Sequence, residues 1–490
     1  MQPEEQLIQQ RIQKLKILRE RGTNPYPYPY RYDIKNNALE ILSKFKKLKK
    51  EQKTNIKVKL AGRITNFRDM GKLSFGHLQD FTGKIQFLAR EDTLEEQKYS
   101  QFRKLDLGDI IGIEGTIFKT KTGEITIWIK NFELLAKSLK PLPEKWHGLQ
   151  DPEIRLRKRY LDLIANPELK KIFIKKNIFW QSIREFLQKE NFIEVETPIL
   201  ETTTGGADAE PFTTHYNAFD VDVYLRISNG ELWQKRLMIA GFEKTFEIGR
   251  QFRNEGVSME HLQDYTQMEF YWAYADYNDC MKLVEKMYKE ITKKVLGNLK
   301  FKTHNFNINL QKKWPKIEYV KEIKKQLNID ILESTKGQLQ KKLDNLNIKY
   351  EKNLEKERLM DLLWKQCRKN ITGPCFVINH PVEVSPLAKR HRKDSRLTER
   401  FQIIIAGTEQ GNGYSELNDP LDQEHRFKEQ ARLREKGDKE AQMYDKDFVE
   451  ALMYGMPPTA GFGISERYFA YLMDKPIREC VLFPFMKPEK

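Results

Sequence analysis

The chain has 490 residues, more than one ordinary domain, and this length predicts about three domains. It holds 86 Lys and Arg against 70 Asp and Glu, for a net charge of +16, and its mean hydropathy is −0.69. No apolar run reaches the ~18–20 residues of a membrane span, and the amino-terminal segment lacks the apolar stretch of a secretory signal. The four cysteines form no CxxC pair, which argues against a zinc site or a disulfide framework. We expect a cytoplasmic protein with no membrane span.

Residues 1–54 are predicted to form a basic helical extension. Apolar residues recur at helical spacing between basic ones, at Ile8, Ile12, Leu15 and Leu18 with Arg11, Lys14 and Arg19. An aromatic turn at 24–33 and a second basic helix follow. Such a segment could bind a nucleic-acid backbone or a membrane surface, or its basic residues could serve only to keep the protein soluble. The pattern alone leaves these three alternatives open.

Residues 55–140 change to a period of two. Five short apolar–polar alternating runs are separated by turns that contain Gly and Asp. Five strands in this length predict a small barrel, with an OB-fold as the leading candidate and an SH3-like barrel as the alternative.

A proline-bearing linker is expected at 141–153, followed by a domain over 154–490. Within it we predict helices at 155–164 and 172–190, then strands and turns through to about Tyr274. The Lys- and Asn-rich section at about 276–370 is expected to be a helical insertion. Strand patterns return at 373–381, 400–419 and 461–472.

Residues 242–274 are predicted to form a hairpin with one ionisable face. Alternation places Glu247, Gln251, Arg253 and Glu255 on one face of the first strand, and Tyr265, Gln267, Glu269 and Tyr271 on one face of the second. A solvated outer face is the simpler alternative, but such a face does not usually carry two tyrosines beside a carboxylate.

Residues 409–419, EQGNGYSELND, are predicted to form a strand with unequal faces. Asn412, Tyr414 and Glu416 share one face, whereas the other carries only Gly411, Gly413 and Ser415. Small residues opposite large polar ones indicate a strand that is pressed against neighbouring backbone and turns its polar side to a pocket. The alternative is a glycine-rich turn.

The sequence has no GxxxxGK[ST] loop and no GxGxxG motif, so neither common nucleotide loop is present. It nevertheless resembles a nucleotide-using family. FRNE, followed by His261, Tyr265 and MEFYWAYADY, resembles motif 2 of class II aminoacyl-tRNA synthetases. FIEVETPIL resembles motif 1 of this class, and GFGISER resembles motif 3. GNGYSELND and PPTAG resemble the lysyl-tRNA synthetases of this class, over nearly the whole chain.

The resemblance implies an α+β architecture, in which an OB-fold barrel precedes a class II catalytic domain built on an antiparallel sheet flanked by helices. It implies ligation of L-lysine to tRNA(Lys) through a lysyl-adenylate, with ATP as substrate, Mg²⁺ as cofactor and release of AMP and diphosphate. It also implies a homodimer, with motif 1 and the helix before it at the interface.

The family's functional positions match residues of this chain. Arg253 and Arg467 would be catalytic and bind phosphates. The expected ATP-binding residues are Arg253, Glu255, His261, Tyr265, Glu409 and Arg467. The expected lysine-binding residues are Gly206, Glu231, Glu269, Tyr271, Asn412, Tyr414 and Glu416. The expected anticodon-binding residues are Arg68, Phe75 and Gln86. The expected metal ligands are Glu409, Gln402 and Glu416, although the family has glutamate where this chain has Gln402.

Rival functions share parts of this pattern. An aspartyl- or asparaginyl-tRNA synthetase would need a cation where this chain has Glu269 and Glu416. A paralogue that lysylates a protein would lack the barrel. A non-catalytic RNA-binding protein would not need Arg253, Glu255 and Arg467.

Overall fold

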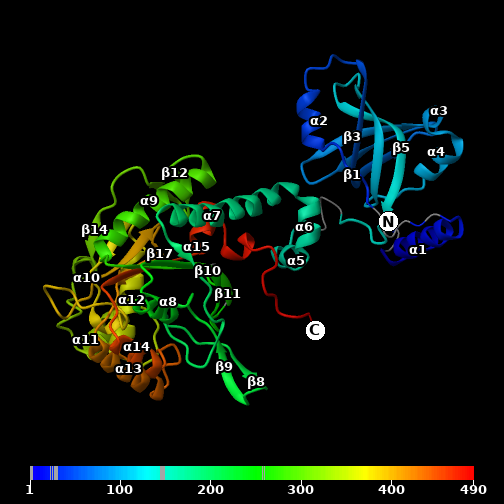
Figure 1. Cartoon of the computed structure of the whole chain (residues 1–490). Helices are drawn as coiled ribbons and strands as arrows, with labels where there is room; N and C mark the ends of the chain where they lie inside the picture. Colours follow the sequence, from blue (N-terminus) through cyan, green and yellow to red (C-terminus); the bar gives the residue numbers. More distant parts are fainter. Residues whose placement is uncertain are drawn as a thin grey trace. The chain divides into compact units, whose positions relative to one another are not determined.

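A computed structural model describes residues 4–22, 24, 26, 31–143, 149–256, 258 and 260–489 of the chain. The chain divides into two compact units, Met1–Pro167 and Glu168–Lys490, each described here by itself (Figure 1). The division falls at Pro167, carboxy-terminal to the expected linker at 141–153. Parts of that linker and of the aromatic turn at 24–33 lie outside the described residues.

The first unit contains a closed barrel. Its elements are α1 (Glu4–Glu20), α2 (Ala38–Lys44), β1 (Lys53–Asp69), β2 (Leu73–Gln79), β3 (Lys84–Arg90), α3 (Glu91–Leu94), α4 (Glu96–Phe102), β4 (Ile110–Lys119), β5 (Ile125–Ala136), α5 (Pro152–Arg157) and α6 (Arg159–Ala165). The strands are ordered β1–β2–β3–β5–β4, and β4 pairs back onto β1. Alternate isoleucines such as Ile111, Ile113 and Ile127 fill the interior. The predicted five-stranded barrel is confirmed.

The predicted amino-terminal helix is present as α1 and is docked within its own unit. Lys14 Nζ lies 2.6 Å from an oxygen of Asp106, and Arg11 donates to the carbonyl oxygen of Lys140 at 2.9 Å. The second predicted helix is shorter than its basic run. It begins at Ala38, after Asn37, whose side chain accepts from the backbone N–H of Glu40, and it ends at Lys44.

The second unit is built on an eight-stranded sheet. The strands of the whole unit, including those outside the large sheet, are β6 (Ile193–Glu194), β7 (Leu200–Glu201), β8 (Thr213–Tyr216), β9 (Val221–Leu225), β10 (Lys244–Phe252), β11 (Asp264–Ala273), β12 (Lys300–Thr303), β13 (Phe306–Asn309), β14 (Lys316–Glu318), β15 (Cys375–Ile378), β16 (Arg400–Ile405), β17 (Thr408–Ser415) and β18 (Thr459–Ser465). The large sheet runs β14–β15–β16–β17–β18–β11–β10–β6 and is antiparallel except at its two edge pairs. The expected α+β class with an antiparallel catalytic sheet is therefore confirmed.

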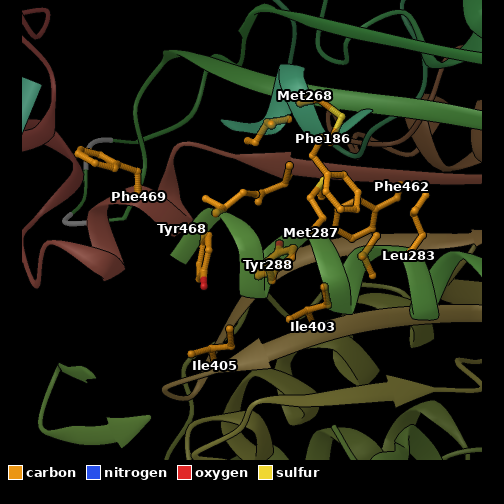
Figure 2. Packing of buried hydrophobic residues seen from close by; sticks show 14 of the residues in the cluster. Phe186, Met268, Leu283, Met287, Tyr288, Ile403, Ile405, Phe462, Tyr468 and Phe469 are labelled. Carbon is orange, nitrogen blue, oxygen red and sulfur yellow. The ribbon is translucent and has the colours of Figure 1, made fainter. Parts of the chain in front are cut away.

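Helices flank this sheet. They are α7 (Lys170–Lys189), α8 (Glu231–Ile239), α9 (Tyr277–Leu296), α10 (Tyr319–Leu327), α11 (Lys336–Asn345), α12 (Lys356–Arg368), α13 (Pro420–Glu435), α14 (Lys446–Met453) and α15 (Arg467–Leu472). Figure 2 shows side chains of α7, α9 and α15 meeting those of the sheet strands, with Tyr288 and Phe462 among them. A core formed by both layers fixes the sheet against its helices.

The section expected to be an insertion at 276–370 contributes to this core. Helix α9 is capped by Asp276, whose side chain accepts from the backbone N–H groups of Asn278 and Asp279, and it is followed by Gly297 at a φ of +82°. Its apolar residues recur every three or four positions, which buries one face against the sheet. Strand β14 of the same section forms the sheet edge. This section is therefore integrated with the sheet at its first helix and at β14.

Two local expectations are wrong. Residues 231–239 form helix α8 inside the region predicted as strands and turns. Residues 467–472 form helix α15, because Tyr468–Leu472 are all buried and carry no alternation to hold them in a strand. The motif 1 segment lies among the predicted strands and turns and forms the two-residue strands β6 and β7, with Pro198 between them, since proline cannot donate to a ladder.

Candidate functional site

The polar faces of β11 and β17 line one cavity of about 290 Å³ in the second unit. The predicted hairpin is confirmed, because β10 and β11 pair antiparallel from Lys244 and Trp272 to Phe252 and Asp264. Strand β18 separates β11 from β17, and its glycines leave room between them. The alternation on both strands therefore identified residues that share a pocket. The cavity brings together all seven predicted lysine-binding residues: Gly206, Glu231, Glu269, Tyr271, Asn412, Tyr414 and Glu416.

Glycines give this cavity its shape. A Cβ added at Gly461 would lie 2.1 Å from Glu416 Oε1 and 2.7 Å from a ring carbon of Tyr271. A Cβ at Gly206 would lie 2.5 Å from Ser228 Oγ, and the residue adopts a φ of +88°, which disfavours any side chain. The opposite face of β17 is equally tight, since a Cβ at Gly411 would meet the ring of Phe462 at 2.6 Å.

Three buried carboxylates lie around the cavity, on Glu231, Glu269 and Glu416. Glu269 accepts from the backbone N–H of Asn229 at 3.0 Å and from the hydroxyl of Tyr271 at 3.1 Å. Burial raises the pKa of Glu269 to about 7, and the nearby Glu231 carboxylate acts in the same direction. Burial also raises the pKa of Glu416 well above its usual range. Such a group of carboxylates favours a cationic ligand.

The sequence patterns missed Lys235, which pairs with two of these carboxylates. Its Nζ lies 2.7 Å from Glu231 Oε1 and 2.5 Å from Glu416 Oε2, and its side chain has no exposed surface. Burial alone would lower the pKa of Lys235, but the two carboxylates outweigh burial and raise it. One available signal was the spacing of Glu231 and Lys235, which are four residues apart as in a helical ion pair.

A second cavity of about 330 Å³ adjoins the first, and Arg253, Glu409 and Arg467 line both. It also brings together Glu255, His261 and Gln402, whereas Tyr265 lines only the first cavity. All the predicted ATP-binding residues therefore lie around one continuous region. Burial and the charge of Arg467 lower the pKa of His261, which favours its neutral form.

The cationic residues at the junction of the cavities are held by backbone groups. Arg253 donates through Nε to the carbonyl oxygen of Ile227 at 3.2 Å, and its guanidinium lies 5.7 Å from the ring centroid of Tyr265. Arg467 donates to the carbonyl oxygens of Glu260 and Glu409, both at 3.4 Å. Guanidinium groups in fixed positions beside a cavity are suited to bind phosphate oxygens.

The expected metal ligands do not form a metal site. Gln402 donates through its amide nitrogen to Glu409 Oε2 at 2.8 Å, while its amide oxygen accepts from Trp364 Nε1 at 3.0 Å. Arg368 lies 3.8 Å from the same Glu409 oxygen, and Glu416 is paired with Lys235 instead. Among the described residues, no three His, Cys, Asp or Glu side chains gather as a metal would need. Because Gln402 presents a donor where a ligand is required, these residues do not fit the predicted metal set.

Helix α12 belongs to the section that was expected to be an insertion, and one of its faces lines the second cavity. Arg358, Asp361, Lys365 and Arg368 lie on this lining. Arg358 also forms ion pairs with Asp208 at 3.3 Å and with Asp438 at 2.9 Å. The sequence signal was their spacing of three or four residues, which places them on one helical face.

The first unit has a cavity of about 610 Å³ on its barrel, and Arg68, Phe75 and Gln86 all line it. Arg68 and Phe75 are cross-strand partners on β1 and β2. Gln86 donates to Glu124 Oε2 at 2.7 Å and accepts from Thr126 Oγ1 at 2.6 Å. Lysines also surround this cavity, at Lys53, Lys119 and Lys121. A half-buried aromatic ring beside basic side chains fits an unstacked nucleic-acid base and its phosphates.

In the part of the chain that the structure covers, every helix is too short or too polar to span a bilayer.

Comparison with known families supports both units. Residues 151–487 match the model of class II tRNA synthetases (D, K and N), and residues 58–135 match the model of the OB-fold nucleic acid binding domain. The two matches cover the eight-stranded sheet and the barrel, respectively.

Relatives with a similar sequence span nearly the full chain. The chain is 46% identical to the lysine–tRNA ligase of Thermosipho africanus and 47% identical to that of Thermotoga maritima, each over 98% of this chain and 96% of the relative. It is 45% identical to the lysine–tRNA ligase of Carboxydothermus hydrogenoformans, over 99% of this chain and 98% of the relative.

Proposed function

The chain belongs to the class II tRNA synthetases (D, K and N), and from this premise we propose that it ligates L-lysine to tRNA(Lys). The reaction would use ATP, pass through a lysyl-adenylate, and release diphosphate and then AMP. One observation carries the choice of lysine within the family. The cavity beside the proposed ATP region is surrounded by the buried carboxylates of Glu231, Glu269 and Glu416.

The carboxylates favour lysine over aspartate or asparagine. A desolvated ammonium is stable only when it is paired and hydrogen-bonded, and lysine brings two such groups. An acidic substrate would instead meet like charges at Glu269 and Glu416. We propose that Glu231 and Glu269 bind the amino-group end of lysine, with Gly206 and Asn412 beside them. Glu416, Tyr271 and Tyr414 would surround the ε-ammonium.

The first step needs no nucleophile from the protein, because the carboxylate of lysine attacks the α-phosphorus of ATP in line. The protein then contributes positioning and charge stabilisation. We propose that Arg253 binds the α-phosphate and Arg467 the γ-phosphate. His261 would approach the β- and γ-phosphates. Glu255 would contact the adenine amino group, and Tyr265 would stack on adenine.

Mg²⁺ is the expected partner of the ATP phosphates, where it would neutralise their charge. The orientation of Gln402 gives no support to a second protein ligand beside Glu409. The steps of the proposed reaction are therefore explained by the side chains of the protein, and none is assigned to a protein-bound metal.

We propose that the barrel reads the anticodon. Phe75 would stack on an unpaired base, while Gln86 and Arg68 would contact its edge and backbone. Because Gln86 is engaged by Glu124 and Thr126, reading a base would require it to exchange these partners. The basic residues of α1 not used for docking would contact the tRNA backbone. This reaction would take place in the cytoplasm.

We further propose a homodimer through motif 1 and α7. Apolar side chains in these segments are exposed, namely Ile174, Ile178, Ile193, Ile199 and Leu200. A two-fold contact would cover them. Light scattering should then give about twice 58.2 kDa at micromolar concentration, and a monomer with full charging activity would contradict the dimer.

The function can be tested by ATP–diphosphate exchange with each of the twenty amino acids. Exchange should depend on lysine, and aspartate and asparagine should give background. Exchange driven by aspartate or asparagine would contradict the proposed substrate.

A further inference from the structure

Lys235 lies behind the side chains that line the amino-acid cavity. It belongs to α8, has no exposed surface and does not itself line the cavity. Its ammonium lies 5.5 Å from the ring centroid of Tyr414 and 6.0 Å from those of Tyr271 and Phe448. A lysine enclosed in this way is unusual, because a buried ammonium is costly unless it is paired.

The partners of Lys235 are two of the cavity's carboxylates. Its Nζ is 2.7 Å from Glu231 Oε1 and 2.5 Å from Glu416 Oε2. Tyr414 donates its hydroxyl to the same Glu231 oxygen. Glu231 lies on α8 and Glu416 directly after β17, so the ammonium links two separate elements across the back of the cavity.

The ion pairs of Lys235 determine the net charge that the buried carboxylates present to a ligand. When all three are ionised, Glu231, Glu269 and Glu416 supply three negative charges, and Lys235 neutralises one. Two negative charges remain, which equals the number of ammonium groups that lysine carries. Among the described residues, Lys235 is the cation within ion-pair distance of these carboxylates. Arg253 and Arg400 also line the cavity and keep their charge, but they donate to neutral groups, Arg253 to Ile227 and Arg400 to Asn412 and Val384.

Given the proposed lysine-binding function of this cavity, we propose that Lys235 is a positioning and specificity-determining residue. Its ammonium fixes Glu231 and Glu416 in place and neutralises one carboxylate, so that the cavity selects a ligand with two ammonium groups.

Other ionisable groups also face this cluster: Glu269, Tyr271, Tyr414, Cys280, Arg253 and Arg400. Burial raises the pKa of Tyr271, Tyr414 and Cys280 well above their usual values, so they stay neutral near pH 7. Burial also raises the pKa of Glu416, and the Lys235 ammonium opposes that shift. Glu416 is therefore the group whose titration should respond to the loss of Lys235.

The test is the pH profile of kcat/KM for lysine in ATP–diphosphate exchange, measured on the full-length protein and Lys235→Met. Lysine binding requires ionised carboxylates, so kcat/KM falls as pH drops through their pKa. Removing an opposite charge at this distance should move that acidic limb to higher pH by about 1–3 units. The effect should appear in KM more than in kcat.

Lys289→Met is the matched control. Lys289 pairs with Glu285 at 2.6 Å with the same four-residue spacing, on α9 and away from the cavity. Its loss should leave the acidic limb in place. A purely structural role of Lys235 predicts the same unmoved limb for Lys235→Met, and that result would overturn the proposal.

The double variant Lys235→Met/Glu231→Gln keeps the test decisive if the single variant does not fold. It removes one buried charge of each sign, so the cluster keeps the net charge of −2 that three carboxylates and one ammonium give in the wild type. Its acidic limb should lie within about half a unit of the wild-type limb. A shift of a full unit or more would refute the charge count. Absence of lysine-dependent exchange in the wild type would instead refute the proposed function itself.

Discussion

Replacing Glu416 by glutamine should weaken lysine binding without disrupting the fold. The side chain is 1% exposed and lies against Gly461, so a substitution of the same shape avoids a steric clash. The change removes one negative charge from the cavity. Lys235 loses its contact at 2.5 Å but keeps Glu231 at 2.7 Å, so its ammonium is not left unpaired.

The size of the effect on lysine binding follows from the burial of Glu416 and from its ion pair with Lys235. Removing one partner of a buried ion pair costs about 3–5 kcal/mol. Lys235 already compensates part of the Glu416 charge, so the lower end applies to the substrate ammonium. A loss of about 3 kcal/mol corresponds to a KM for lysine that rises about a hundredfold, at about 1.4 kcal/mol for each factor of ten.

The assay is lysine-dependent ATP–diphosphate exchange, with Glu399→Gln as the control. Glu399 is also a buried carboxylate beside β17, but it accepts from Ser415 on the opposite face of the strand, at 2.8 Å. Its substitution should leave the KM for lysine within about twofold, since it removes no charge from the cavity. A Glu416→Gln variant with a wild-type KM would refute the assignment of this cavity to lysine.

Three further outcomes are expected. Arg253→Ala should reduce adenylate formation by orders of magnitude with an unchanged circular dichroism spectrum, since preorganised charge acts mainly in the transition state; near-normal exchange would contradict its role. Phe75→Ala should weaken tRNA charging by about 1–3 kcal/mol while exchange stays nearly unchanged, and equal losses in both would identify Phe75 as a core residue. Glu201→Gln should raise the unfolding free energy by about 3 kcal/mol at pH 8 and by little near pH 4.5, because burial raises the pKa of Glu201 to about 7. The folded protein retains that proton up to about pH 7 and the unfolded chain releases it near 4.5, so the cost grows across this window; equal effects at both pH values would contradict it.

The strands that line the cavity could be predicted because alternation alone decides which side chains share a face. On β11 it groups Glu269 with Tyr271, and on β17 and the residue after it, Tyr414 with Glu416. The same period of two predicted the barrel, since one face of each strand is packed inside. These features depend only on neighbours along the chain.

Other features depend on tertiary context. Lysine is a residue type that is usually exposed, and the burial of Lys235 in α8 depends in part on a distant partner, the Glu416 carboxylate directly after β17. Residues 467–472 form a helix in which Tyr468–Leu472 are all buried, and this burial removes the periodicity that distinguishes helix from strand. The orientation of Gln402 is set by Trp364 from α12, some forty residues away. Sequence patterns give no account of such distant partners.

The most direct test of the proposed function is aminoacylation of a tRNA transcript that carries a UUU anticodon. With ATP and Mg²⁺, the protein should attach lysine to this transcript, and changing the central anticodon base should reduce charging sharply while ATP–diphosphate exchange is unaffected. Attachment of aspartate or asparagine in place of lysine, or charging that ignores the anticodon, would contradict the account.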